Sequence, residues 1–527
     1  MKRSFMNTQN DLIRNITAHI APRHWLSLGT GVFVGIITHL YMLTNKLPNW
    51  DDLNNLYGYG SGALYGRWLL EYIHDWAGHW SVPALNGMLA ILFMSVSACL
   101  ILDALELRSV TSAILLPMVV VTFPSLACVM TFMFMADLYT LGFLTNCVAA
   151  WLIRKYRWGF VPGAILMMLG LSIYQSLICA AAGILVLGLA IELFRGEELK
   201  KIWRKGLVSL GSLMVALGSY VVITKFVVGG LGDNKGISSM GEISLLQLPR
   251  LIGRAYLRTL EFFVTKPWGF VSDFGKTVNL LVIAAIFLLF FYLLYRKGIF
   301  KDIPRLIFLC VMLLLVPLAL AAVYIMAPDA GGTLLTLYQY FLIYGTLLGL
   351  WELWMETEPL FAAGNTSAVL WAKRVLAGFA CILVFFVAHD NFVLTHNTYF
   401  RMSIAYERIH SFYERLYYRI EEQEGYKLGD PIAILGDWWP ERNILSSHEI
   451  DIGRYDSMEG VAMENGLFTT GVRRNFLRIY LGIDYEEVGG VTMQELMKTE
   501  EFRNMPDYPA EGCVQRIDGI WVIRVAD

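Results

Sequence analysis

The chain has 527 residues, of which 56% are hydrophobic and only 16% are charged. A soluble domain carries about 25% charged residues, and here the charges sit in short segments between long uncharged ones, which excludes an ordinary soluble globular protein. The net charge of −2 gives no sign of a nucleic-acid partner, and we expect none.

Uncharged stretches long enough to cross a membrane recur along the chain. A helix of about 20 apolar residues spans the hydrocarbon core of a bilayer, so we predict an α-helical polytopic membrane protein with about eleven transmembrane helices. The first stretch lacks a cleavage site and is expected to remain as a span. The predicted spans are 25–43, 84–102, 109–127, 135–153, 159–174, 176–194, 206–227, 277–295, 305–325, 334–354 and 374–394. The divisions within 109–153 and 159–194 stay open.

The distribution of lysine and arginine predicts how these spans are oriented. If the N-terminus lies in the cytoplasm, the cytoplasmic loops carry most of the basic residues, with clusters at 154–157, 195–205 and 296–305. The opposite loops carry few, apart from the loop 228–276. Because eleven is an odd number, the chain after residue 395 is then expected outside the cytoplasm.

The loop between the first two spans, residues 44–83, holds the first candidate site. Asp51 and Asp52 are adjacent carboxylates directly after the first span, although a helix N-cap or a solvated turn would account for either one alone. From residue 61 the loop is predicted to form an amphipathic helix in the membrane interface, since large apolar residues recur every four positions. These residues are Leu64, Trp68, Tyr72, Trp76 and Trp80. Arg67 and Glu71 share the other face, where a weak surface pair is the simpler interpretation.

A second amphipathic stretch lies in the loop 228–276. Arg250, Arg254 and Arg258 repeat there at four-residue spacing among apolar residues. Three guanidiniums on one stripe suit phosphate groups. Plain attraction to anionic lipid headgroups is the simpler alternative to a substrate phosphate.

Polar residues also fall inside or beside the predicted spans. Asp137 is the most informative of them, because an ionisable side chain at membrane depth marks a functional site by default. Tyr174-Gln175 and Tyr338-Gln339 are less costly to bury and often serve only as hydrogen-bond partners between helices.

The tail, residues 395–527, has a different and more charged composition. Residues 397–424 are predicted to be helical and to continue the last span. Residues 431–435 and 520–525 are predicted to be short strands. At this length the tail can form one small α/β domain.

The acidic pair Asp51-Asp52 directly after the first span, followed by Gly66-Arg67-Trp68, resembles the bacterial type II glucosyltransferases of the Gtr type. Those proteins modify O-antigen and related surface glycans. The resemblance continues in Phe123-Pro124, Met135-Ala136-Asp137, Tyr139, Tyr174-Gln175 and the stretch from 405–408 to 434–436, so it covers most of the chain.

The resemblance implies a membrane architecture similar to the GT-C glycosyltransferases. Residues 1–394 would form a multi-span catalytic domain whose external loop, 44–83, carries the active site, and 395–527 would form an extracytoplasmic α/β domain. The location implied is the bacterial cytoplasmic (inner) membrane. The donor implied is a polyprenyl-phosphate-linked sugar, usually glucose, and the acceptor is a surface polysaccharide.

The chemistry that such a transfer needs suggests roles for the candidate residues. Asp51 or Asp52 would take the proton from the acceptor hydroxyl as general base. Arg67 would hold the donor phosphate, with help from the arginines of the 250–258 stripe. The remaining substrate-binding candidates are Trp68, Glu71, Asp137, Tyr174 and Gln175. The outer domain is expected to shape acceptor choice without supplying the base.

No cofactor or metal is expected. The sequence has no GxGxxG after a strand and no GxxxxGK[ST], and a lipid-linked sugar is already activated. His74 and His79 lack a third ligand nearby, and no CxxC pair occurs among the seven cysteines. The main alternative function is a transporter or flippase of lipid-linked sugars, which inverted repeats would favour, but we find none.

Overall fold

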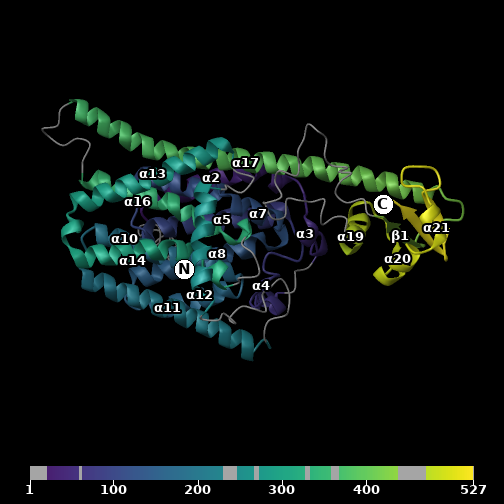
Figure 1. Cartoon of the computed structure of the whole chain (residues 1–527), viewed down its shortest axis with the longest axis horizontal. Coiled ribbons are helices and arrows are strands. Elements are labelled where there is room, and N and C mark those ends of the chain that lie inside the picture. Colours follow the sequence, from purple (N-terminus) through teal and green to yellow (C-terminus); the bar gives the residue numbers. More distant parts are fainter. Residues whose placement is uncertain are drawn as a thin grey trace, which may run out of the picture. The chain divides into compact units, whose positions relative to one another are not determined.

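The computed structural model describes residues 20–57, 62–229, 246–265, 272–326, 333–357, 367–436 and 470–525. These residues are mostly helical, with one small sheet near the C-terminus (Figure 1). The chain divides into two compact units. The helical unit comprises Met1–Lys46, Gly58–Asn397 and Ser457–Glu459, and the α/β unit comprises Leu47–Tyr57, Thr398–Asp456 and Gly460–Asp527.

Eight helices of the described residues are long and apolar enough to cross a membrane. They are α2 (Pro22–Thr44), α5 (Pro83–Ala104), α8 (Met133–Lys155), α10 with the turn before it (Gln175–Phe194), α11 (Leu199–Phe226), α13 (Asp273–Arg296), α14 (Ile303–Leu320) and α17 (Ser367–Glu421). A ninth span arises if α6 (Val110–Thr122) and α7 (Pro124–Thr131) are taken together. That pair is bent by 41°, because Phe123 precedes a proline and adopts an extended backbone there.

All eleven predicted segments coincide with helical structure, but two of them are short. Helix α9 (Phe160–Leu171) has 12 residues and α16 (Leu342–Thr357) has 16. At 1.5 Å per residue these lengths cover only about 18 and 24 Å, less than the hydrocarbon core of about 30 Å. The structure therefore supports a polytopic membrane protein without confirming the count of eleven.

Close helix packing in the helical unit depends on small residues. Helix α2 packs against α5 and α6, and α5 also packs against α8. A Cβ atom on Gly35 of α2 would lie 2.5 Å from Ile91 of α5, and one on Gly31 would lie 2.7 Å from the Ser95 hydroxyl. Glycine at these positions lets the two backbones approach, as is common between membrane helices.

Ion pairs join several helices at one end of the helical unit, which we call the charged end. The guanidinium of Arg154 lies 3.0 Å from the Glu192 carboxylate, and both side chains are buried. Arg195 pairs with Glu106. Further pairs are Arg23–Asp103, His24–Asp103, Lys155–Asp103, Lys205–Glu192 and Arg195–Glu356. Basic loops predicted to share one side thus meet at one end, although the side of the membrane stays a prediction.

Glu352 of α16 also lies at the charged end, where it bonds the residues directly before helix α6. Its carboxylate accepts hydrogen bonds from the backbone N–H groups of Arg108 and Ser109, at 2.7 and 2.9 Å. The Ser112 hydroxyl donates to it at 2.6 Å. A carboxylate at a helix N-terminus satisfies amides that have no partner within the helix.

The helical elements not yet named are short. They are α3 (Trp50–Asn54), the 3₁₀ turn Ala63–Tyr65, α4 (Leu70–Ile73), α12 (Leu248–Leu260), the π-turn Glu261–Thr265, α15 (Val323–Met326), and the 3₁₀ turns Ile299–Lys301, Leu334–Thr336 and Tyr338–Phe341. Helix α17 is continuous over 55 residues. The prediction that the helix continues after residue 397 is therefore confirmed up to Glu421.

The sheet of the α/β unit has four strands in the order β2-β1-β4-β3. They are β1 (Pro431–Leu435), β2 (Glu486–Glu487), β3 (Val514–Ile517) and β4 (Ile520–Arg524). Strand β1 runs parallel to both β2 and β4, while β3 and β4 form a hairpin. Asp518 and Gly519 both have positive φ at its tip, 49° and 84°, which a tight hairpin turn requires. The strands predicted at 431–435 and 520–525 are confirmed.

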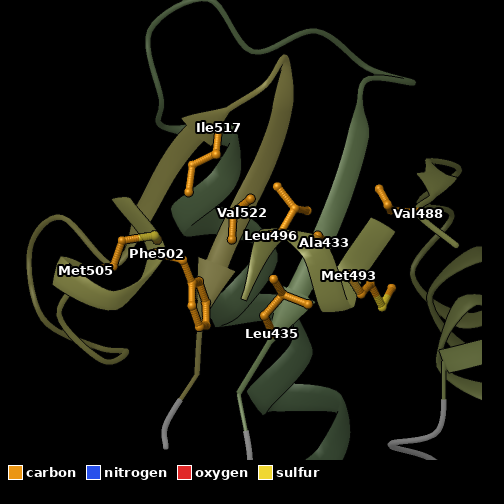
Figure 2. Close-up of a cluster of buried hydrophobic side chains, with 9 residues drawn as sticks. All are labelled: Ala433, Leu435, Val488, Met493, Leu496, Phe502, Met505, Ile517 and Val522. Carbon is orange, nitrogen blue, oxygen red and sulfur yellow. The ribbon is translucent and has the colours of Figure 1, made fainter. Parts of the chain in front are cut away.

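Short helices cover the sheet and bury an apolar core (Figure 2). They are α20 (Gly490–Leu496) and α21 (Glu500–Asn504), while α19 (Thr470–Tyr480) is a third helix of the unit. Ala433 and Val522 from neighbouring strands are fully buried in this core. At its edge the indole N–H of Trp521 donates to Asp430 at 2.9 Å. This bond, together with one from the backbone of Lys427, lowers the pKa of the Asp430 carboxyl.

Candidate functional site

The residues after the acidic pair do not form the interfacial helix predicted from residue 61 onward. Only the turn Ala63–Tyr65 and the one-turn helix α4 are helical there. Gly66 adopts a left-handed backbone with φ 73°, and the backbone N–H of Arg67 returns to the carbonyl of Gly62 at 2.8 Å. A left-handed residue ends a helix, so the four-residue spacing of aromatics was misleading.

Arg67 lies within a group of tyrosines, which we call the Arg67 cage: Arg67, Tyr65, Tyr139 and Tyr174. Nη1 of Arg67 donates to the Tyr139 hydroxyl at 3.0 Å. The centre of the guanidinium lies 4.5 Å from the ring centroid of Tyr174 and 5.9 Å from those of Tyr65 and Tyr139. The rings of Tyr139 and Tyr174 contact each other, with centroids 4.8 Å apart. The cage therefore fixes the plane of a cationic side chain.

Gln175 supports the turn that presents Arg67. Its amide donates to the carbonyl of Tyr65 and to the hydroxyl of Tyr220 at 3.0 Å. Tyr220, from α11, donates in turn to the carbonyl of Gly66 at 3.0 Å. Gln175 thus acts on the backbone of the turn, whereas Tyr174 beside it contacts the guanidinium itself.

Trp68 and Glu71 flank this turn. The indole Nε1 of Trp68 is buried and has no hydrogen-bond partner among the residues that the structure describes. Glu71 accepts a hydrogen bond from the backbone N–H of Ala63 at 3.2 Å. The Glu71 contact is structural, since it ties α4 back to the turn before Gly66.

Asp137 is 1% exposed and is used as an anchor for the same loop. Its carboxylate accepts hydrogen bonds from the indole of Trp76 at 2.7 Å and from the amide of Asn86 at 3.2 Å. Asn86 in turn accepts from the backbone N–H of Val82 at 2.9 Å. Both side chains that donate to the carboxylate belong to the loop or to the start of α5, so a structural role explains them without a substrate.

The three arginines of the second amphipathic stretch lie on helix α12. Arg250 and Arg258 are exposed and Arg254 is partly buried, while Leu251 and Ala255 face the interior. The predicted stripe is therefore present. Arg258 lies 2.8 Å from the Glu261 carboxylate one turn later, which offsets part of its charge.

Asp51 and Asp52 lie on the short helix α3, in the α/β unit. The side chain of Asn49 accepts from the backbone N–H of Asp52 at 2.9 Å, so Asn49 is the N-cap and neither aspartate is. Asp52 is 1% exposed and Asp51 is partly exposed. The loop 44–83 is thus divided between the two units.

Helix α3 packs against α19 (Figure 1). The amide of Asn475 donates to the side-chain oxygen of Asn54 at 2.9 Å, across 421 positions of sequence. Arg473 of α19 is 4% exposed. None of these α19 residues was singled out from the sequence, where nothing connects a charged tail segment to the first loop.

The tail holds further acidic and aromatic residues that lie outside the described part of the chain: Asp437, Trp438-Trp439, Glu449, Asp451 and Asp456. Within the described residues no group of three or more His, Cys, Asp or Glu side chains could hold a metal ion. His74 and His79 both bond to the carboxylate of Asp75.

Fold and site define a helical membrane protein with a caged arginine in the loop after its first span. A family model described as Glucosyl transferase GtrII matches residues 40–349, which is more than half of the chain. The chain therefore belongs to the glucosyl transferase GtrII family, and the resemblance to type II glucosyltransferases is confirmed. Family membership assigns it to the proteins that transfer glycosyl groups. Comparison with curated proteins and with solved structures gave no match.

Proposed function

We propose that the protein transfers glucose from a polyprenyl-phosphate donor to a surface polysaccharide outside the cytoplasm. Asp51 or Asp52 is the general base and Arg67 binds the donor phosphate. The protein works in the bacterial cytoplasmic membrane with a GT-C-like architecture, its N-terminus inside and its α/β unit outside. The observation that carries the proposal is the Arg67 cage in a chain of the GtrII family.

A caged arginine suits a phosphate ligand. The guanidinium is a planar fork of N–H donors that matches two phosphate oxygens at once. Contact with the Tyr174 ring and the Tyr139 hydroxyl orients this fork. These tyrosine contacts leave the positive charge in place, and an anionic group approaching the edge of the guanidinium would meet it.

The proposed chemistry needs only these two kinds of side chain. The acceptor oxygen attacks the anomeric carbon of glucose, and the bond from that carbon to the phosphate oxygen breaks. The proton of the acceptor hydroxyl goes to the aspartate, and polyprenyl phosphate leaves with the electron pair. Arg67 stabilises the charge that develops on the departing phosphate.

The activity is tested by incubating purified protein with polyprenyl-phosphate glucose and surface polysaccharide from the producing cell. Mass spectrometry should show a hexose added to the polysaccharide and free polyprenyl phosphate. Polyprenyl-phosphate mannose and galactose are the matched controls for the sugar. An intact donor in every mixture would contradict the proposal, and movement of that donor across vesicles without bond cleavage would favour the transporter.

The orientation is tested separately with cysteine labelling in intact cells. Gln515 lies exposed on β3, and Arg108 lies exposed beside the charged end. In a background where exposed Cys310 is serine, Gln515→Cys should react with an impermeant maleimide in intact cells. Arg108→Cys should react only after lysis, and the reverse pattern would overturn the proposed orientation.

A further inference from the structure

The two adjacent aspartates of α3 have different surroundings. Successive residues of a helix point about 100° apart, so Asp51 and Asp52 face different directions. Asp52 is 1% exposed, whereas Asp51 is partly exposed. A base that must reach the hydroxyl of a large glycan needs the accessible position.

Helix α3 packs against helix α19 within the α/β unit. Asn54 and Asn475 are hydrogen-bonded across this contact at 2.9 Å. Arg473 is 4% exposed on α19, so it brings a guanidinium into a packed region. At the end of α19, the phenol of Tyr480 is hydrogen-bonded with Tyr406, and the charge of Asp52 acts on it at longer range.

Asp52 and Arg473 are both charged and both buried, and burial limits how such groups can be accommodated. A carboxylate or guanidinium removed from water is tolerated only when it is paired and hydrogen-bonded. Burial raises the pKa of Tyr480 although its hydrogen bond with Tyr406 lowers it, so the phenol stays protonated at neutral pH. A guanidinium can supply both the opposite charge and the N–H donors that a buried carboxylate needs.

We propose that Asp52 is a positioning residue, held by Arg473 of α19, and that Asp51 is the carboxylate that takes the acceptor proton. This inference rests on the proposed function. It also assigns to α19 a share in the active site, although α19 lies beyond the residues 40–349 that the family model matches. The expectation that the tail acts only on acceptor choice would then be replaced.

The test compares single and double variants in the glucose-transfer assay, together with thermal unfolding in detergent. Asp51→Asn should lower kcat at least about a hundredfold, within the range for removal of a general base, and leave the melting temperature unchanged. Asp52→Asn should lower both kcat and the melting temperature, because Arg473 then lacks its counter-charge. Adding Arg473→Met to Asp52→Asn should restore part of the melting temperature, as expected for two coupled residues.

The matched control is Asn475→Ala, which removes a partly exposed contact between the same helices and should change kcat less than about threefold, as for a surface position. Arg473→Lys keeps the charge and should retain more activity than Arg473→Met. The inference is overturned if Asp51→Asn transfers glucose at the wild-type rate while Asp52→Asn does not. It is also overturned if Asp52→Asn and Arg473→Met lower the melting temperature additively. Unchanged transfer by both aspartate variants would instead reject the general base of the proposed function.

Discussion

The charged end of the helical unit and the Arg67 cage hold their arginines in different ways. At the charged end, Arg154 meets the Glu192 carboxylate at 3.0 Å and both side chains are buried. In the cage, the described contacts of Arg67 are a tyrosine hydroxyl and tyrosine rings. Carboxylates cancel the charge of a guanidinium, whereas tyrosines orient it. The charged end holds helices together, whereas the cage fixes the orientation of the arginine that we propose binds the donor phosphate.

The largest expected effect is on stability at the charged end. Glu192→Leu removes the carboxylate that Arg154 and Lys205 share and leaves Arg154 buried without it. The loss of one partner of a buried pair costs about 3–5 kcal/mol of unfolding free energy. Thermal unfolding in detergent measures this loss, and transfer per folded molecule should stay unchanged. If Glu192→Leu is as stable as the wild type but transfers less glucose, the charged end does not have the purely structural role given to it here.

The second effect is on catalysis in the cage. Arg67→Ala should lower kcat/KM for polyprenyl-phosphate glucose by about a hundredfold, equal to about 2.7 kcal/mol of transition-state stabilisation. Arg67→Lys keeps the charge without the fork and should lie between wild type and Ala. Donor titrations at fixed polysaccharide give both parameters. If Arg67→Ala uses the donor like the wild type, the cage does not bind phosphate.

A smaller effect is expected at Asp137, which tests anchor against substrate ligand. Asp137→Asn keeps an acceptor for the Trp76 indole, so the loop should stay in place and transfer should fall no more than about tenfold. Asp137→Leu leaves that indole without a partner and should lower the melting temperature more. Complete loss of transfer by a thermally unchanged Asp137→Asn would show that the carboxylate acts on the substrate.

The smallest effect is expected on helix α12. Arg250→Ala removes an exposed arginine whose attraction to phosphate is screened by salt. The KM for the donor should rise by about threefold or less at 0.15 M salt. Arg258→Ala is the comparison, because its exposed pair with Glu261 contributes at most about 1 kcal/mol. A rise in KM as large as that of Arg67→Ala would place α12 in the donor site.

The sequence supports the coarse architecture because the membrane imposes a length on every span. Runs of apolar residues located the helices, and the continuation of α17 followed from its charged helical extension. The hairpin tip at Asp518-Gly519 and the edge strand β2 were missed. A two-residue strand carries no alternation of apolar and polar residues to detect.

The site was predictable in part. Arg67, Tyr174 and Gln175 were singled out, and the structure brings them together at one turn. The helix expected from residue 61 was wrong, because the left-handed Gly66 outweighs the aromatic spacing. The contact between Asn54 and Asn475 depends on folding across 421 positions. A single sequence contains no local signal for such a contact.

The carboxylate of Glu352 has a consequence for the order in which the protein is assembled. It accepts from the amides of Arg108 and Ser109 just before α6, yet it is made 243 positions after Ser109. At about 5–20 residues per second of synthesis, those amides wait roughly 12–50 seconds for it. The start of α6 therefore reaches its final bonding only when α16 arrives. A nascent chain that stops before α16 exposes an unfinished helix start to quality-control proteases.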